Sequence, residues 1–283
     1  MFNRADGKLL RHTDPMYRVA AHIMVKRSDS MNNITLDIPL EPIEAYLRRK
    51  KKEGCSMSHM AVILAAVTRT ICEFPALNRF VVNKRVYARN EIAIGMVVLK
   101  AGATGAETMN KIYLQPQDTI QEVNQRINDY VNASRDVADE NPTDKIIKVL
   151  VGIPGLLRVG VTLLKWLDKH NLLPKAIINA SPMHNTLVFT NLASIRTNYI
   201  HHHCYDFGTT SMIMAAGNSR EVPRRTRDGE IVHEKCLPLG LVMDERIASG
   251  YYFSQAFRRM KEYFKNPALL EEPPEKVVVD PEL

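Results

Sequence analysis

The sequence is poor in several residue types, and each shortage excludes a class of protein. Its 283 residues include only four cysteines, none of them in a Cys-x-x-Cys pair, which disfavours a disulfide framework. The most apolar stretch, residues 146–167, is interrupted by a proline and three cations, whereas a bilayer span needs about 20 largely apolar residues. Residues 1–10 lack the apolar core of a secretory signal. We therefore expect a cytoplasmic protein with no membrane span.

Several motifs are also missing. The chain has no Gly-rich phosphate loop, no His-Glu-x-x-His helix and no Gly-x-Ser-x-Gly elbow. Positive charge is only in mild excess, with 38 Lys and Arg against 31 Asp and Glu, a net charge of +7. The main basic run, residues 48–52, ends an expected helix, where the helix dipole favours cations, and no aromatic platform accompanies it. We expect no nucleic-acid partner. Two interpretations of the basic run stay open: a solvated helix end, or a site that binds a phosphorylated small molecule.

What is present is an alternation of strand and helix patterns, typical of an α/β protein with one large core. Strands are expected at 33–40, 81–87 (a hairpin), 92–99, 186–190, 211–216 and 237–243, and helices at 41–53, 60–74, 119–137 and 250–264. Two of these helices start at residues that favour the N-cap position, Thr119 and Ser249.

An unusually apolar segment, residues 141–180, interrupts this pattern. Nearly everything between Leu156 and Leu167 is apolar. The polar residues of this segment share one stripe at helical spacing: Arg158, Thr162, Lys165 and Lys169. Such a helix is buried on most sides or lies at a lipid or partner surface. We expect an insertion that is covered by the protein itself or by another copy of it.

The C-terminal third resembles a known family. The run from Leu239 to Gly250, followed by an aromatic helix, is similar to the signature of the dihydrolipoamide acyltransferase catalytic domain of 2-oxoacid dehydrogenases. Chloramphenicol acetyltransferase shares that fold, and in both a strand delivers His-x-x-x-Asp-Gly just before a helix. Further segments follow the family's order: 73–78, 91–98, 189–192 and 228–232. The resemblance covers roughly residues 17–265 with the insertion left out.

This resemblance implies a fold and an activity. The expected fold is an α/β (α+β) two-layer sandwich of the chloramphenicol acetyltransferase type, with a mixed sheet and helices packed on one face. The expected activity is acyl transfer from coenzyme A to a small-molecule or carrier-bound acceptor, in a homotrimer whose cleft lies between subunits. We expect an N-terminal arm (1–16), an acyltransferase-like domain (17–270) and an acidic tail (271–283). Since only sixteen residues precede the match, we expect a stand-alone domain that carries no lipoyl group.

Site positions can be carried over from the family one residue at a time. Thr190 stands where the family has the hydroxyl that donates to the oxyanion, and Asn191 follows it. Glu245 occupies the position of the catalytic histidine, so the His-x-x-x-Asp-Gly motif is degenerate. The residues expected to support the site are Arg18, as the arginine partner of the motif, with Asp244, Arg246 and Ser249. Ser249 fills the position of the signature Asp and is also favoured as a helix N-cap.

Three interpretations stay open because the family histidine is missing. Glu245 is itself the base, which requires an apolar channel around its carboxylate. Alternatively, a histidine from elsewhere has taken the role, with His202 as the catalytic candidate. The candidates for substrate binding beside it are His184, His201 and His203. Finally, the chain is a catalytically inactive pseudoenzyme that serves as a binding or scaffolding protein. Because neighbouring side chains on a strand point to opposite faces, the three consecutive histidines predict no metal site.

Overall fold

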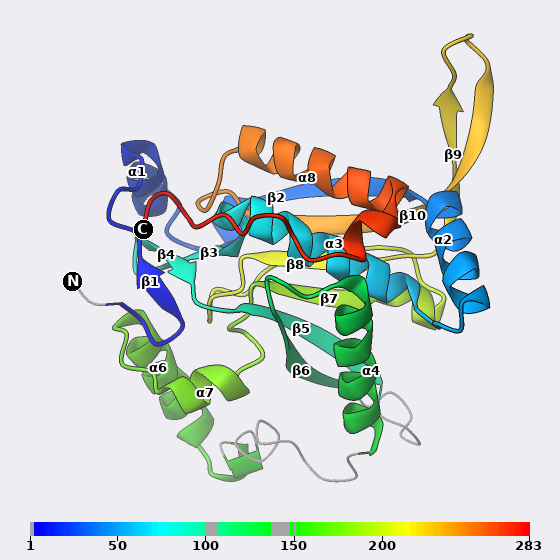
Figure 1. The fold of residues 1–283 in the computed structure, drawn as a ribbon. Helices are drawn as coiled ribbons and strands as arrows, with labels where there is room; N and C mark the ends of the chain where they lie inside the picture. The colour runs from blue at the N-terminus through cyan, green and yellow to red at the C-terminus, as the bar shows by residue number, and fades with distance from the viewer. Residues whose placement is uncertain (1–2, 100–106, 137–147, 150) are drawn as a thin grey trace.

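The computed structural model describes residues 3–99, 107–136, 148–149 and 151–283, and it contains two sheets (Figure 1). The larger one is ordered β2-β10-β8-β7-β5-β6, with β9 paired to the outer part of β10. Its strands are β2 (Met31–Pro39), β5 (Ile92–Leu99), β6 (Glu107–Leu114), β7 (Leu187–Asn191), β8 (Met212–Ala216), β9 (Arg220–Arg225) and β10 (Ile231–Asp244). It is a mixed sheet, because β7 runs parallel to both β5 and β8 while the other pairs are antiparallel.

A smaller three-stranded sheet stands at one end of the large one. It is ordered β1-β4-β3, from β1 (Gly7–Leu9), β3 (Arg79–Val82) and β4 (Arg85–Arg89). The expected hairpin forms β3 and β4, and its two turn residues, Asn83 and Lys84, both have positive φ angles of 48° and 61°. Such a turn matches the twist of the flanking strands. The hairpin prediction is thus confirmed.

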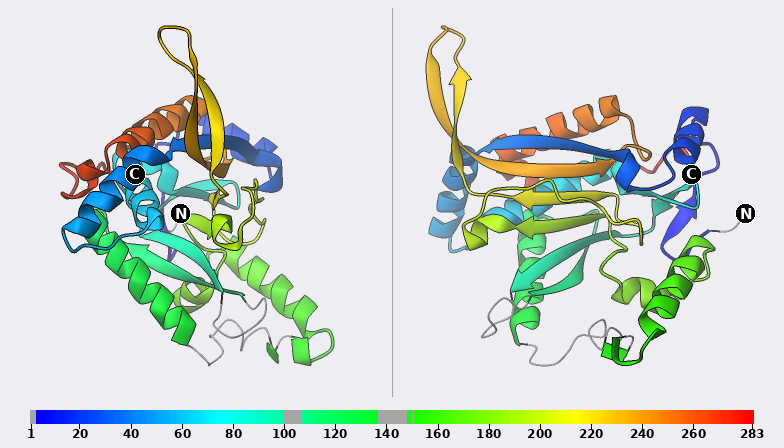
Figure 2. Two further views of the ribbon diagram at one scale, coloured as in Figure 1. Left: turned by 90° about the vertical axis from the view of Figure 1, so that its right-hand side faces the viewer. Right: turned by 180° about the vertical axis from the view of Figure 1, so that it is seen from behind.

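The helices α2, α3, α4 and α8, called the main helices below, pack on one face of the large sheet, as the view from behind shows (Figure 2). The helices are α1 (Pro15–Ile23), α2 (Leu40–Lys52), α3 (His59–Glu73), α4 (Ile120–Asp136), α6 (Leu156–Lys169), α7 (Lys175–Ala180) and α8 (Gly250–Lys265). Most of α3 is buried because it packs on the sheet with α8 on one side and α4 on the other (Figure 1). The expected two-layer fold is confirmed.

Local sequence signals set the helix starts. Ser58 and Ser249 each accept a hydrogen bond from a backbone amide of the first turn that follows. Thr119 and Glu122 form a reciprocal capping box at the start of α4, with Glu122 accepting from the Thr119 amide at 2.7 Å. The expected N-caps are therefore confirmed, because a cap needs only residues that are neighbours in the chain.

The insertion forms the expected helix α6 but does not bury it. Only Asp168 of this helix is buried, while Leu163 and Trp166 are 52% and 51% exposed. The expectation that the chain itself covers this helix is wrong, since only its C-terminal end is anchored to the body. Covering by a second copy stays a prediction. Residues 141–147 and 150 of the expected insertion lie outside the described residues.

The C-terminal segment, residues 271–283, is extended and returns to the body of the protein. The Val278 amide donates to the Cys72 carbonyl, and Asp280 forms an ion pair of 2.6 Å with Arg79. Across the described ranges, none of the helices is both long enough and apolar enough to cross a bilayer.

Candidate functional site

The face of the large sheet opposite the main helices contains an apolar pocket of about 450 Å³. Alternation along the strands produces it. On β7, Leu187 and Phe189 belong to the core under the helices, so Val188 and Thr190 point to the other face. The lining comprises Val97, Met109, Met183, Val188, Thr190, Leu192, Ile200, His202, Cys204, Tyr205, Phe207, Thr210 and Ile213. The pocket is thus a concave, mostly apolar site with a few polar groups, as small-molecule sites usually are.

Thr190 brings a free hydroxyl to this pocket. The residue is half-buried on β7, and no group in the described part of the chain hydrogen-bonds to its side chain. A partly buried hydroxyl usually finds a partner inside the protein or in a ligand or water. The Thr190 hydroxyl is therefore available to donate to a bound molecule.

His202 lines the same pocket from the loop that follows β7. Its Nδ1 lies 3.0 Å from the carbonyl oxygen of His203. Because a carbonyl can only accept, this contact places the proton of the neutral ring on Nδ1 and leaves Nε2 with the lone pair. The ring also stacks on His203 at 5.2 Å and meets the edge of Tyr205 at 6.1 Å. The structure thus brings His202 and Thr190 together, as the second interpretation of the sequence requires.

The two neighbouring histidines do not line this pocket. The Nε2 atom of His201 lies 3.2 Å from both the Thr35 hydroxyl and the Ile34 carbonyl, at strand β2. His203 is exposed and contacts His202 through its ring. Asn191, also expected at the site, is exposed at the end of β7, and its carbonyl accepts from Ser194. None of these three residues belongs to the lining.

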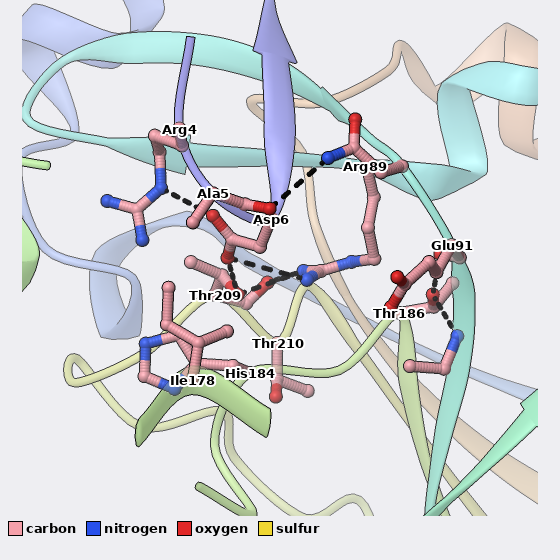
Figure 3. Close-up of polar contacts among 12 residues, drawn as sticks. Arg4, Ala5, Asp6, Arg89, Glu91, Ile178, His184, Thr186, Thr209 and Thr210 are labelled. Atoms are coloured by element: carbon pink, nitrogen blue, oxygen red, sulfur yellow. Dashed lines mark hydrogen bonds and ion pairs between the residues drawn. The ribbon is translucent and has the colours of Figure 1, made fainter. Parts of the chain in front are cut away.

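His184 is buried in an ionic cluster instead (Figure 3). Its Nδ1 lies 2.7 Å from the Ser181 hydroxyl, and its Nε2 lies 3.3 Å from an Asp168 carboxylate oxygen. Burial lowers the pKa of His184, and the nearby Asp168 opposes this without reversing it. His184 is therefore neutral near pH 7 and is placed to support Asp168.

The rest of this cluster comes from the N-terminal segment and β4. Arg4 pairs with Asp168 at 2.6 Å and with Asp6 at 2.8 Å, while Arg89 donates to the Thr209 carbonyl at 2.7 Å. Burial alone would raise the pKa of Asp6, but Arg4 and Arg89 hold it below its usual value. The sequence offers no signal for this cluster, because 164 residues separate Arg4 from Asp168.

A second buried cluster surrounds the signature. Asp244, fully buried at the end of β10, pairs with Arg246 at 2.6 Å and accepts from the Ser30 hydroxyl at 3.0 Å. Arg27 contributes a further ion pair of 3.7 Å. The expected arginine, Arg18, is not among its partners, since it donates to the Arg11 carbonyl on the surface of α1. Arg246 and Arg27 thus hold this carboxylate, and sequence comparison did not indicate Arg27.

Glu245 lies away from the pocket within one chain. Its carboxylate accepts from the Asn32 side chain at 2.8 Å, at an exposed position. Thr190 pairs with Ala215 of β8, which is level with Gly240 of β10, five residues before Glu245. At roughly 3.3 Å per strand residue, this separates the two positions by about 16 Å along the sheet. Ser249, further along the motif, caps α8.

No three His, Cys, Asp or Glu side chains in the described ranges are grouped so that they could hold a metal ion. The consecutive histidines are directed to different places, with His201 at β2 and His202 in the pocket. The polar groups that line the Thr190–His202 pocket are three hydroxyls, one thiol and one imidazole.

Comparison with known proteins supports the resemblance. Residues 207–271, which include the signature, match the family model of the 2-oxoacid dehydrogenases acyltransferase (catalytic domain). A probable dihydrolipoamide acetyltransferase from Listeria monocytogenes 4b F2365 has a similar fold, with a TM-score of 0.56 and 15% identity over 90% of this chain and 94% of that one. No curated protein matches the chain in sequence.

Two further structures share this fold. The dihydrolipoamide acetyltransferase (E2p) of Azotobacter vinelandii gives a TM-score of 0.57 at 11% identity, over 92% of this chain and 93% of that one. A chloramphenicol acetyltransferase gives 0.56 at 12% identity, over 92% of this chain and 100% of that one. The fold predicted from the signature is thus confirmed, and the C-terminal quarter carries the sequence pattern of the acyltransferase domain.

Proposed function

We propose that this protein transfers an acyl group from a coenzyme A thioester to a thiol or hydroxyl acceptor in the Thr190–His202 pocket. The observation that supports it best is the pairing of a free Thr190 hydroxyl with a histidine whose Nε2 carries the lone pair. A general base and an oxyanion donor are the two groups that acyl transfer needs.

The proposed reaction uses these two side chains in turn. His202 removes the proton from the acceptor through Nε2, and the acceptor attacks the thioester carbonyl. The carbonyl oxygen becomes negative and accepts a hydrogen bond from the Thr190 hydroxyl. When the C–S bond breaks, the acyl group stays on the acceptor, and the coenzyme A thiolate takes the proton from His202. In the Azotobacter vinelandii enzyme, a serine, a histidine and an asparagine have been investigated for their role in the catalytic mechanism.

The pocket also indicates the kind of group transferred or modified. None of its lining residues is charged, and most are aliphatic, aromatic or Met. Burying a charge there without a partner would be costly, so the bound group is uncharged and largely apolar. A volume of about 450 Å³ suits a small molecule or one end of a larger one.

The chain is proposed to act as a homotrimer. The pocket lies on the sheet face opposite the main helices, and the strand register puts Glu245 five residues beyond the level of Thr190. In a trimer with its clefts between subunits, Glu245 of one copy would face the pocket of the next. The Thr190–His202 pair needs no such contribution, because a single chain supplies both residues.

The test of this function compares two variants with matched controls. Thr190→Val keeps the shape of the side chain but removes the hydroxyl, and Thr190→Ser restores it. We expect acyl transfer from acetyl-CoA and longer acyl-CoAs to thiol and alcohol acceptors to fall about 10²–10³-fold in the valine variant only. His202→Gln should lower it about 10²–10⁴-fold, while the exposed His233→Gln leaves it unchanged. Equal rates in all four variants would rule out this site.

The second candidate function is a catalytically inactive binding or scaffolding protein. It is favoured by one observation, the carboxylate of Glu245 in the family's histidine position, engaged with Asn32. A calorimetric titration with coenzyme A and acetyl-CoA separates the two functions. Failure to bind either compound, together with no transfer, would establish the second.

A further inference from the structure

A separate cleft of about 300 Å³ lies between α6, the β3–β4 turn and two loops. Its charged lining residues are Lys26, Arg27, Lys84, Lys165, Asp168, Lys169, Asp206 and Arg246. Six of these eight side chains are cations, although they come from distant parts of the chain. This is a concentration of positive charge that the mild net charge of the whole protein does not suggest.

The two carboxylates of this cleft are already engaged. Asp168 is paired with Arg4 at 2.6 Å and lies beside His184. Asp206 accepts from the Arg27 backbone amide at 2.8 Å, which holds the loop. Asp206 keeps its negative charge, so the six cations of the lining face two carboxylates, one of which is already paired with Arg4.

Four lysines surround the opening: Lys26, Lys84, Lys165 and Lys169. All four are exposed, and in the described part of the chain none has an ion-pair partner. Lys165 and Lys169 stand four residues apart on α6, where like charges repel each other. A bound anion would relieve that repulsion.

The rear of the cleft also consists of cationic side chains. Arg27 is buried, and its two terminal nitrogens donate to the Tyr205 and Val81 carbonyls. Its Nε lies 3.7 Å from an Asp244 carboxylate oxygen and makes no hydrogen bond within the described residues. Arg246 lies beside it, and together they outweigh the single charge of Asp244. The field in the cleft is therefore positive from the rim to the rear.

We propose that this cleft binds the phosphate groups of a small molecule, a diphosphate being the best match. Several separate ammonium groups suit a ligand with several negative oxygens, and lysine binds phosphate as a point charge. The cleft shares Phe207 with the Thr190–His202 pocket, so its ligand has two sources. The phosphates belong either to coenzyme A or to a separate phosphorylated molecule, and the site itself does not depend on acyl transfer.

Inorganic pyrophosphate tests the site by calorimetric titration of the full chain. The variant Lys165→Gln/Lys169→Gln should bind it at least about tenfold more weakly, since two charge contacts are lost. The control Lys51→Gln/Lys52→Gln removes the same charge from the end of α2 and should bind as the parent does. Because the contacts are electrostatic, raising the ionic strength should weaken binding to the parent. Both variants leave Asp168 and its partners in place, and circular dichroism verifies their fold.

Competition then identifies the source of the phosphate. Displacement of pyrophosphate by coenzyme A but not by phosphate-free pantetheine would support the site and assign it to coenzyme A. Retention of pyrophosphate beside coenzyme A would support the site and assign it to a separate phosphorylated ligand. No binding to the parent, or equal binding to both double variants, would overturn it. Acyl transfer that depends on Thr190 would stand in that case, so the two proposals fail separately.

Discussion

At the scale of single residues, surroundings decide what each histidine can do. His202 contacts a backbone carbonyl through Nδ1 and lines an apolar pocket, so the neutral form of its ring can accept a hydrogen bond through Nε2. His184 is buried, and both of its ring nitrogens face protein groups, Ser181 and Asp168, so its role is structural. His202 thus lies in the same pocket as the unpartnered Thr190 hydroxyl, whereas His184 lies beside the Arg4–Asp168 ion pair.

The pKa of His184 makes a prediction about stability. Folding lowers this pKa below its ordinary value of 6.5, so the unfolded state binds the proton more readily. Stability should therefore fall as the pH drops through about 6.5 towards the folded-state pKa. Thermal unfolding between pH 8 and pH 5 measures this. The variant His184→Gln should lose part of this pH dependence, and an unchanged profile would show that His184 does not contribute.

At the scale of elements, α6 depends on its C-terminal end. The helix exposes apolar side chains along most of its length and is anchored where Asp168 meets Arg4 and His184. Its sequence predicted the helix, because periodicity is local. It could not predict the anchor, since the partner of Asp168 lies in the N-terminal segment.

Removing Arg4 should free this helix. The variant Arg4→Met leaves Asp168 buried without its arginine and leaves Asp6 with Arg89 alone, and breaking a buried pair costs about 3–5 kcal/mol. We expect faster cleavage by trypsin at Arg158 and Lys165 and a lower urea midpoint. Arg158→Gln changes an exposed residue of the same helix. It should change the free energy of unfolding by no more than about 0.5 kcal/mol. If Arg4→Met unfolds like the parent, α6 is held by other contacts.

The site shows the same division between local and distant information. Thr190 and the N-cap Ser249 could be located from motif and pattern, because their surroundings are set by neighbouring residues. The sequence also names His202 as the catalytic candidate, but its place in the pocket depends on how the loop crosses the sheet. Arg27 could not be located from the sequence either, because it reaches Asp244 only through the pairing of β2 with β10.

At the scale of the whole molecule, some apolar surfaces are left uncovered, and two of them bear on the assembly. One is the sheet face with the Thr190–His202 pocket, and the other is α6. Contiguous apolar surface of this kind usually marks an interface. Both the pocket and the exposed helix agree with the proposed homotrimer.

Light scattering tests this assembly. Three copies of the 32.1 kDa chain should elute together, and the mass should not change on dilution through the micromolar range. The variant Trp166→Ser tests whether α6 lies in the interface between subunits. If it does, removing the apolar surface of Trp166 should weaken the assembly. A monomer at all concentrations would contradict the trimer and any role of a neighbouring Glu245.

The ion pair between Arg4 and Asp168 also has a consequence for synthesis. The arginine is made 164 residues before its partner, and domains begin to fold as they emerge. Until α6 has left the ribosome, the segment before β1 carries a cation, Arg4, whose burial site is incomplete. The N-terminal segment must therefore stay solvated during most of translation, and its docking completes the structure only after the helix near the middle of the chain is in place.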